Sequence, residues 1–418
     1  MTTDVRVYVE IGNSPVHAGH LYSHRRHQTE SASFAYAESY LGSGDAYPLD
    51  PGLPLRSGTQ QTPVGLPLFR AFMDSSPDRW GRNLLLRAER VQAQETNSTS
   101  RSLGELDLLL GVRDDLRQGS VRFRAERDPT FLAAEDTGVP QLTDLPSLLA
   151  AADRVDADVA DSADLALLLR AGSSLGGARP KAHVSVDGTL AIAKFPSQSS
   201  DRWNVMAWEK TALDLADAAG IEVPVSRLVK VADRDVLVVD RFDRDGQWRI
   251  GYCSALTMLE AGRSDIRSYP EIGEALEERS GAATDELRQL WRRLAFSVLI
   301  TNTDDHLRNH GFLHRSGDIW SLSPAFDLNP NPDPGPKHLS TAIDGDDTTA
   351  SLDLVMRVAP YFRLAPEQAR AALSDVVVAH ARWETVAAEA GLTRHAIADM
   401  APAFEHPQTE RARDLVRG

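Results

Sequence analysis

Cysteine, long apolar runs and positive charge are all scarce in this sequence. Cys253 is the one cysteine among 418 residues, so the chain has no internal disulfide and no C-x-x-C metal motif. No run of about 18 or more apolar residues occurs, and no apolar leader segment stands near the N-terminus. We therefore expect neither a membrane-spanning nor an exported protein, and place it in the cytoplasm.

Acidic residues clearly outnumber basic ones. Lys and Arg total 45 against 60 Asp and Glu, which gives a formal net charge of -15 and a pI near 5.3. A chain with this charge is not expected to bind nucleic acid through phosphate contacts of its own. The apolar and charged fractions are typical of a folded globular protein. Its length exceeds one ordinary core, so we expect two or three domains.

Two kinds of apolar periodicity divide the chain. Alternation of apolar and polar residues predicts strands, and the Asp187-Gly188 pair predicts a tight hairpin between two of them. The predicted strands cover residues 4–10, 33–38, 120–124, 181–186, 189–195, 225–231 and 235–242. Helical spacing predicts helices over residues 67–90 (broken at 75–78), 103–110, 145–171 (one or two helices, connecting two lobes), 203–219 and most of 352–415.

The chain from Tyr269 onward is predicted to be mostly helical. Thr284 is expected to cap a helix whose first turn carries Asp285 and Glu286, which favour the positive end of the helix dipole. Its predicted buried stripe consists of Leu287, Leu290, Trp291, Leu294 and Val298. This helix leads directly into the most informative stretch of the sequence, residues 302–327.

Three oxygen-bearing side chains stand in that stretch: Asp304, Asn309 and, after a turn at 315–318, Asp327. In protein-kinase-type phosphoryl transfer, one carboxylate accepts the proton of the attacking hydroxyl while an asparagine and a second aspartate hold Mg2+. The Asp-to-Asn spacing matches the kinase catalytic loop, although no His-Arg pair precedes Asp304 and no Phe-Gly pair follows Asp327. Because Asp and Asn also favour turns, such a segment alone is more often structural.

A glycine-containing segment precedes the predicted hairpin. The adjacent Gly176 and Gly177 allow the backbone to approach an anion closely, although the segment lacks the Walker A pattern. A Gly-Gly pair by itself is usually only a turn. The sequence therefore offers a candidate phosphate loop that needs support from other residues.

Lys194 lies on the second hairpin strand and is predicted to share a face with Leu190 and Ile192. A lysine on an apolar face needs a partner, and Glu209 on the next helix is the residue placed to provide it, as in kinases. The alternative is an edge strand whose lysine points to solvent. The strand that ends at Phe242 then enters a linker, where kinases have the hinge that contacts adenine.

Taken together, these segments resemble the HipA family of bacterial serine/threonine kinases, the toxin half of HipBA-type toxin–antitoxin modules. The matching segments are 174–181, 192–196, 239–243, 303–309 and 324–327, with further likeness at 47–49, 53–55, 77–81 and 106–109. The resemblance implies an α+β, protein-kinase-like two-lobed fold. We expect a small β-rich N-terminal subdomain (1–125), a nucleotide-binding part (126–242) and a mostly helical C-terminal lobe (243–418).

The resemblance also implies a role for each matching residue. Asp304 would be the catalytic base, with Asn309 and Asp327 as Mg2+ ligands. The residues expected to contact ATP are Gly176, Gly177, Lys194, Glu209, Asp240, Phe242 and His306. Ser174 matches a serine that HipA-like kinases autophosphorylate, and Ser173 is a second candidate. A phosphate at either serine would repel the phosphates of ATP.

Substrates and partners are implied only by the resemblance. The expected substrate is an aminoacyl-tRNA synthetase such as glutamyl-tRNA synthetase, whose phosphorylation would arrest growth. The expected partner is a HipB-like DNA-binding antitoxin, so that the chain meets DNA only indirectly and no membrane is involved. A kinase-like corepressor with weak or lost catalysis, acting with such an antitoxin, is the alternative.

Two further hypotheses concern other classes of protein. Asp304, Asp305, His306 and His310 could form a metal-hydrolase cluster, but that hypothesis leaves Lys194 unexplained. Residues 386–397 have the spacing of a helix-turn-helix. Acidic residues surround the two side chains that could contact DNA there, so we expect a packed helical hairpin instead.

Overall fold

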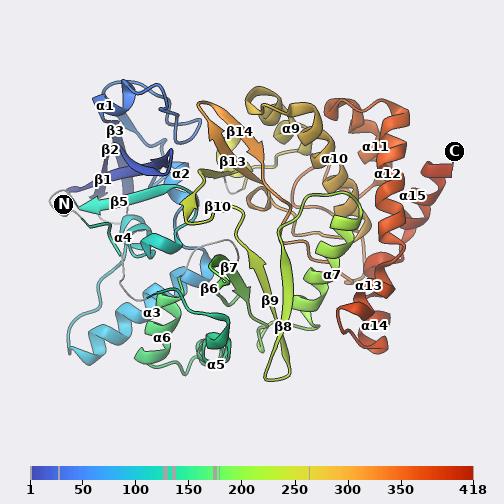
Figure 1. The fold of residues 1–418 in the computed structure, drawn as a ribbon, viewed down its shortest axis with the longest axis horizontal. Coiled ribbons are helices and arrows are strands. Elements are labelled where there is room, and N and C mark those ends of the chain that lie inside the picture. Colours follow the sequence, from blue (N-terminus) through green and yellow to red (C-terminus); the bar gives the residue numbers. More distant parts are fainter. Residues whose placement is uncertain are drawn as a thin grey trace. The chain divides into compact units, whose positions relative to one another are not determined.

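The protein forms two compact units (Figure 1). The structure, a computed structural model, describes residues 2–26, 29–125, 130–133, 138–172, 177, 179–262 and 264–417. Unit 1 comprises Met1–Ser200, Val231–Cys253 and Leu313–Asp318, and unit 2 comprises Asp201–Lys230, Ser254–Phe312 and Ile319–Gly418. The fold-class prediction is confirmed, with strands concentrated toward the N-terminus and helices toward the C-terminus. The predicted boundaries at residues 125 and 242 stay predictions.

Unit 1 begins with an antiparallel sheet in the order β4-β3-β2-β1-β5. Its strands are β1 (Thr2–Ile11), β2 (Ser14–Arg26), β3 (Thr29–Tyr36), β4 (Thr59–Gln61) and β5 (Val121–Ala125). Alternation buries Val5, Val7 and Val9 of β1, and Val7 lies opposite the buried Phe123 of β5. The sequence analysis did not predict β2, because few of its side chains are buried and its pattern is largely polar.

Six α-helices among the described residues of unit 1 lie between or after these strands in the sequence. They are α1 (Glu38–Leu41), α2 (Arg70–Asp74), α3 (Arg79–Glu95), α4 (Glu105–Leu110), α5 (Leu145–Asp156) and α6 (Ser162–Arg170). The predicted helix over 145–171 is thus two helices. Both belong to unit 1, where α6 packs against α3 and α5, so the prediction that this segment connects two lobes is wrong.

The predicted hairpin is confirmed. Strands β6 (Lys181–Val186) and β7 (Thr189–Lys194) are joined by Asp187 and Gly188, which both have positive φ as a two-residue hairpin turn requires. Strand β9 (Arg234–Asp240) pairs with the other side of β7. Three short strands, β10 (Arg244–Asp245), β11 (Trp248–Arg249) and β12 (Tyr252–Ser254), follow β9 along the chain.

Unit 2 is built around helices whose apolar faces are buried. Along α10 (Ala283–Leu299), every residue of the predicted stripe has 0% exposure. The other elements are α7 (Val205–Ala218), β8 (Ser226–Val231), α8 (Ala255–Met258), α9 (Tyr269–Arg279), α11 (Leu352–Val358), α12 (Pro366–His380), α13 (Trp383–Glu389), α14 (Arg394–Phe404) and α15 (Pro407–Arg417). None of the described helices combines the length and apolarity needed to cross a bilayer.

Two sequence predictions about this part of the chain are wrong. Thr284 does not cap α10, because the helix begins at Ala283 and Ala282, two residues before Thr284, occupies the cap position; Thr284 instead accepts a hydrogen bond from Arg363. The chain after α10 is also less helical than expected. It contains β13 (Gly311–Ser316), β14 (Ile319–Leu322) and a non-helical segment from 323 to 351.

The helix-turn-helix-like segment is a packed pair of helices, as predicted. Helix α13 buries Trp383 and Val386, and α14 buries Met400 and Phe404. The rings of Trp383 and Phe404 stack with centroids 4.7 Å apart, which joins the two helices through apolar contact.

Candidate active site

The loop that follows α10 carries the predicted catalytic aspartate. Thr301 has a positive φ of 51°, which turns the chain sharply at the end of the helix. Asp304 is exposed, whereas Asp305 and Asn309, which follow it in the loop, are 3% and 8% exposed. The adjacent aspartates therefore have opposite surroundings, and Asp304 is the one accessible from solvent.

Hydrogen bonds within the loop fix Asn309 relative to Asp304. The backbone carbonyl of Asp304 accepts from the N–H of His306 at 2.9 Å and from Nδ2 of Asn309 at 3.1 Å. Since the Asn309 amide nitrogen is used in this bond, its Oδ1 is the atom suited to a cation. His306 is half-buried, and its Nδ1 has no hydrogen-bond partner among the described residues.

Buried contacts of Asp305 hold the Asp304 loop in place. Its carboxylate accepts a hydrogen bond from Tyr269 and lies 3.0 Å from Nε2 of His310, and its backbone carbonyl accepts from Oγ1 of Thr341 at 2.7 Å. Burial alone would raise the pKa of Asp305, but His310 and the hydrogen bonds to the carboxylate outweigh it and lower the pKa. Asp305 is thus ionised and holds the loop through its buried contacts, whereas the neighbouring Asp304 is exposed to solvent.

A second loop brings Asp327 to the same part of unit 2. Asp327 is half-buried and has a φ of 60°, a left-handed conformation that Asp and Asn tolerate better than most residues. Nδ2 of Asn329 donates to the Asp327 carbonyl at 3.2 Å, and the N–H of Asn329 donates to Oδ1 of Asn302 at 3.3 Å.

Further bonds join the two loops. Nδ2 of Asn331 donates to Oγ1 of Thr303 at 2.9 Å, and Oγ1 of Thr301 donates to the Asn331 carbonyl at 2.7 Å. Together with the Asn329–Asn302 bond, they hold the Asp327 loop against the Asp304 loop. Unit 2 therefore joins the two loops that carry the three residues predicted for proton transfer and metal binding.

The donor set fits Mg2+ rather than a softer metal. Asn309 and Asp327 supply amide and carboxylate oxygens, the hard ligands that Mg2+ prefers. The metal-hydrolase hypothesis is not supported, because Asp305 is engaged with Tyr269 and His310. Within the part of the chain that the structure describes, no group of three or more His, Cys, Asp or Glu side chains is arranged to hold a metal.

Lys194 lies on a central strand of unit 1. Because β7 pairs with both β6 and β9, the alternative in which Lys194 sits on an edge strand is wrong. Leu190, Ile192 and Lys194 are half-buried along one face, while the alternate residues Ala191 and Ala193 are fully buried. This pattern confirms the predicted face. Glu209 is buried on α7 of unit 2, and the predicted Lys194–Glu209 pair stays a prediction.

The glycine-containing segment is described only in part. Gly177 has a φ of 103°, a conformation that favours glycine, whereas Ser173, Ser174 and Gly176 lie outside the described residues. After this segment, the buried Lys181 forms an ion pair with Asp78, the N-cap of α3. The indole of Trp80 also donates to the Lys181 carbonyl at 3.2 Å. Two sequence segments about a hundred residues apart are thus joined at the start of β6.

Several residues that support the site were missed from the sequence. Tyr269, Asn302, Asn329 and Thr341 were not singled out, and Asp305 was considered only as a metal ligand. The repeated Asn-Pro pairs at 329–332 were the available signal, since such asparagines commonly bond to nearby backbone. Tyr269 and Thr341 lie far from the loop in the sequence and offered no local signal.

A comparison with known protein families concerns the segment that contains the candidate site residues. Residues 173–384, half of the chain, match the sequence model of the HipA-like C-terminal domain. A candidate kinase of Sinorhizobium fredii, Y4dM, is 29% identical over 215 residues, which cover 47% of this chain and 49% of that protein. A candidate kinase of Haemophilus influenzae is 24% identical over 135 residues, 29% of this chain and 39% of that protein. The matches thus span about half or less of these relatives.

A solved structure resembles the chain over its whole length. HipA of Shewanella oneidensis MR-1, determined in a complex with HipB and operator DNA, superimposes with a TM-score of 0.64. The match covers 99% of both chains at 16% sequence identity. At this level of identity the similarity establishes a shared fold.

Proposed function

The chain belongs to the family defined by the HipA-like C-terminal domain, and from this membership we propose that it is an ATP- and Mg2+-dependent serine/threonine protein kinase, the toxin of a toxin–antitoxin module. The observation that carries the proposal is the junction of the Asp304 and Asp327 loops in unit 2. The two joined loops carry an exposed carboxylate, an amide and a second carboxylate, the residue types that protein-kinase-type phosphoryl transfer uses.

In this proposal each residue has a distinct task. Asp304 accepts the proton of the substrate hydroxyl, and its exposure keeps it accessible. Asn309 and Asp327 would hold Mg2+, which when bound neutralises charge on the triphosphate. Lys194, on the half-buried face of β7, would contact ATP phosphates, and Gly177 would let the backbone approach them. Catalysis then depends on positioning and electrostatics rather than on a covalent enzyme intermediate.

The protein substrate belongs to the proposal as well. We propose an aminoacyl-tRNA synthetase, with glutamyl-tRNA synthetase as the first candidate to assay. Autophosphorylation at Ser174, or at Ser173, would place charge in the glycine-containing segment and oppose ATP binding.

The partner we propose is an antitoxin similar to HipB. The full-length fold similarity to a HipA bound to HipB and operator DNA supports this choice. The net charge of -15 supports DNA contact through the antitoxin rather than through this chain. A corepressor role with weak catalysis is the second candidate, favoured by the same complex.

Intact-mass spectrometry before and after incubation with Mg-ATP tests the kinase proposal. The wild-type protein should gain phosphate at Ser174 or Ser173 and should transfer phosphate to the synthetase, whereas Asp304→Gln should do neither. Because Asp304 is exposed, this variant should unfold at the wild-type temperature. If the wild type neither binds ATP by calorimetry nor gains phosphate, the corepressor role becomes the better proposal.

A further inference from the structure

The chain just after β9 alternates between two environments. Asp240 and Phe242, the residues expected to contact adenine, are half-buried, whereas Arg241 and Asp243 are only 5% and 2% exposed. The N–H of Arg241 donates to the Leu190 carbonyl at 3.0 Å, so the pairing with β7 continues past the end of β9. After β9 the chain enters a turn at Phe242 and Asp243. Burial thus separates Arg241 and Asp243 from the candidate adenine-contacting pair.

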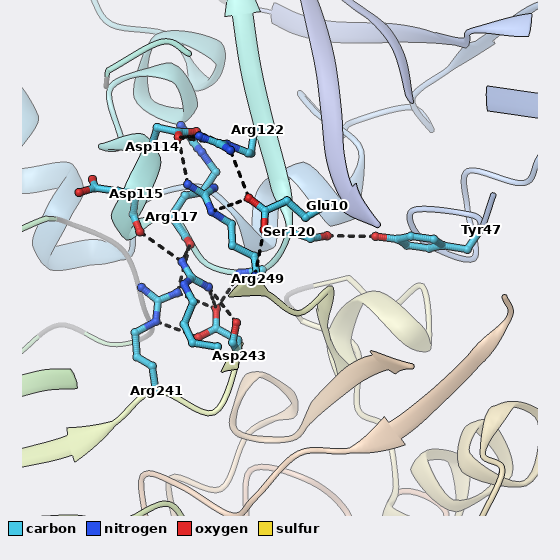
Figure 2. Close-up of polar contacts among 12 residues, drawn as sticks. Glu10, Tyr47, Asp114, Asp115, Arg117, Ser120, Arg122, Arg241, Asp243 and Arg249 are labelled. Atoms are coloured by element: carbon cyan, nitrogen blue, oxygen red, sulfur yellow. Dashed lines mark hydrogen bonds and ion pairs between the residues drawn. The ribbon is translucent and has the colours of Figure 1, made fainter. Parts of the chain in front are cut away.

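The buried pair binds a loop of the N-terminal sheet region, residues 113–120, which connects α4 to β5 (Figure 2). Arg241 donates through Nη1 to the Leu116 carbonyl at 2.6 Å and through Nη2 to the Arg117 carbonyl at 3.1 Å. The carboxylate of Asp243 accepts from the backbone N–H of Gly119 at 2.8 Å. These contacts are made to backbone groups, so they fix the backbone of the 113–120 loop relative to residues 241–243.

Asp243 is the centre of this junction. Its carboxylate accepts from Nε of Arg241 at 2.8 Å and Nη2 at 2.6 Å, and from Nη1 of Arg244 at 2.9 Å. Burial by itself raises the pKa of Asp243, but Arg241 and Arg244 outweigh burial and hold the pKa well below its ordinary value. Charge-assisted, bidentate bonds of this kind are stronger and more directional than neutral ones.

The 113–120 loop is itself held firmly by the N-terminal sheet region. The fully buried Arg117 donates to the carbonyls of Ser75, Leu109 and Val112. Asp114 binds Arg122 of β5 at 2.6 Å and Arg249 at 2.9 Å, and Glu10 at the end of β1 contacts both arginines (Figure 2). The loop therefore has little freedom to move.

The same loop also touches the helix that leads into the glycine-containing segment. Nη1 of Arg113 donates to the Arg170 carbonyl at 2.7 Å, at the end of α6. A Cβ added to Gly172 would lie 2.6 Å from Cδ1 of Leu116. One loop of the N-terminal region thus supports two segments that the proposed function assigns to the nucleotide site.

We propose that Arg241 and Asp243 are positioning residues for adenine recognition, and that the 113–120 loop is the base on which Asp240 and Phe242 are held. The inference rests on the proposed kinase function. It makes the N-terminal β-rich region an integral part of the nucleotide site. Changing the buried pair should weaken recognition of the nucleoside more than recognition of the phosphates.

Calorimetric binding to the full chain tests this inference with two separate probes, adenosine and inorganic tripolyphosphate. Asp243→Asn should weaken adenosine binding about tenfold or more and leave tripolyphosphate binding within about twofold. Glu89→Gln is the matched control, because it also removes an arginine-paired carboxylate of unit 1, on α3, but takes part in none of the contacts described above for the 113–120 loop. It should leave adenosine binding within about twofold.

Each outcome decides the inference. Equal losses of adenosine affinity in Asp243→Asn and Glu89→Gln, or equal losses for both probes in Asp243→Asn, would overturn it and leave the kinase proposal intact. Failure of the wild type to bind either adenosine or ATP would overturn both. If Asp243→Asn does not fold, Arg241→Lys replaces it under the same criteria, because it keeps the charge but loses the bidentate bond.

Discussion

The segment after β9 in unit 1 and the loop after α10 in unit 2 both bury the neighbour of a more accessible functional candidate. Asp243 and Arg241 are buried beside Asp240 and Phe242, and Asp305 is buried beside Asp304. The two anchors differ in their partners. In unit 1, guanidinium groups bind backbone carbonyls of a loop more than a hundred residues away, whereas Asp305 binds the side chains of Tyr269 and His310.

This difference has an energetic consequence. More arginines than carboxylates are buried around the 113–120 loop, and burial lowers the pKa of both Arg117 and Arg244 to about 9. Each carboxylate there compensates several cations, so the cluster depends on Asp114 and Asp243. The carboxylate of Asp305, by contrast, contacts only two side chains that the structure describes, Tyr269 and His310. The comparison teaches that the residues proposed for chemistry are exposed or half-buried, whereas their buried neighbours make the contacts that hold each segment in place.

The largest expected effect concerns a proposed metal ligand. Asp327→Asn should lower phosphoryl transfer by about a hundredfold, because it weakens the proposed binding of Mg2+, which is worth several kcal/mol to the transition state. The fold should not change, because Asn tolerates the φ of 60° at this position. Initial rates at several Mg2+ concentrations measure the effect. Asp333→Asn, a nearby exposed carboxylate not assigned to the metal, is the control and should keep wild-type rates.

A substitution at Asp305, the buried aspartate of the Asp304–Asp305 pair, should mainly lower the stability of the protein. Asp305→Asn should destabilise the protein by about 3 kcal/mol, since it removes the buried charged acceptor of the Tyr269 hydroxyl and the carboxylate that contacts His310. Urea unfolding followed by tryptophan fluorescence measures this change. Asp304→Gln should shift the same curve by less than about 0.5 kcal/mol, since it is exposed. Equal shifts in the two variants would contradict the division of roles within this loop.

Low pH should reduce the stability that the buried aspartates of both segments contribute. The pKa values of Asp114, Asp243 and Asp305 are lowered in the folded protein. Their stabilisation is therefore fully present above the unfolded-state pKa of about 4 and is lost as pH falls through the folded-state values. The urea midpoint of the wild type should drop between pH 5 and pH 3. Asp243→Asn should show a shallower decline; an unchanged slope would mean that Asp243 is not an ionised anchor.

The smallest effect is expected at the surface. Arg411 and Asp353 form an ion pair 2.7 Å apart, with 45% and 62% of their side chains exposed. Arg411→Ala should leave the thermal unfolding midpoint close to that of the wild type, because solvent and salt screen exposed pairs. Thermal unfolding in low and high salt checks this expectation and provides the baseline for the buried anchors. A loss as large as that of Asp305→Asn would remove the distinction between them.

Local patterns predicted the parts of the fold that depend on neighbouring residues. The Asp187-Gly188 hairpin follows from two residues that accept positive φ, and the α10 stripe follows from helical spacing. Strand β2 was missed because one of its faces is polar, and β13 because its outer residues are exposed. The cap of α10 was misplaced because a turn at Gly281–Ala282 starts the helix earlier.

By itself the sequence determined the order of the candidate catalytic residues and the resemblance that links them to a family. Only the tertiary structure decided which aspartate of the Asp304–Asp305 pair is exposed, that Lys194 lies on a central strand, and that Arg241 and Asp243 bind the 113–120 loop. The physical reason is that burial and hydrogen bonding depend on partners distant in the chain. Local periodicity describes a residue's own element and contains no information about those partners.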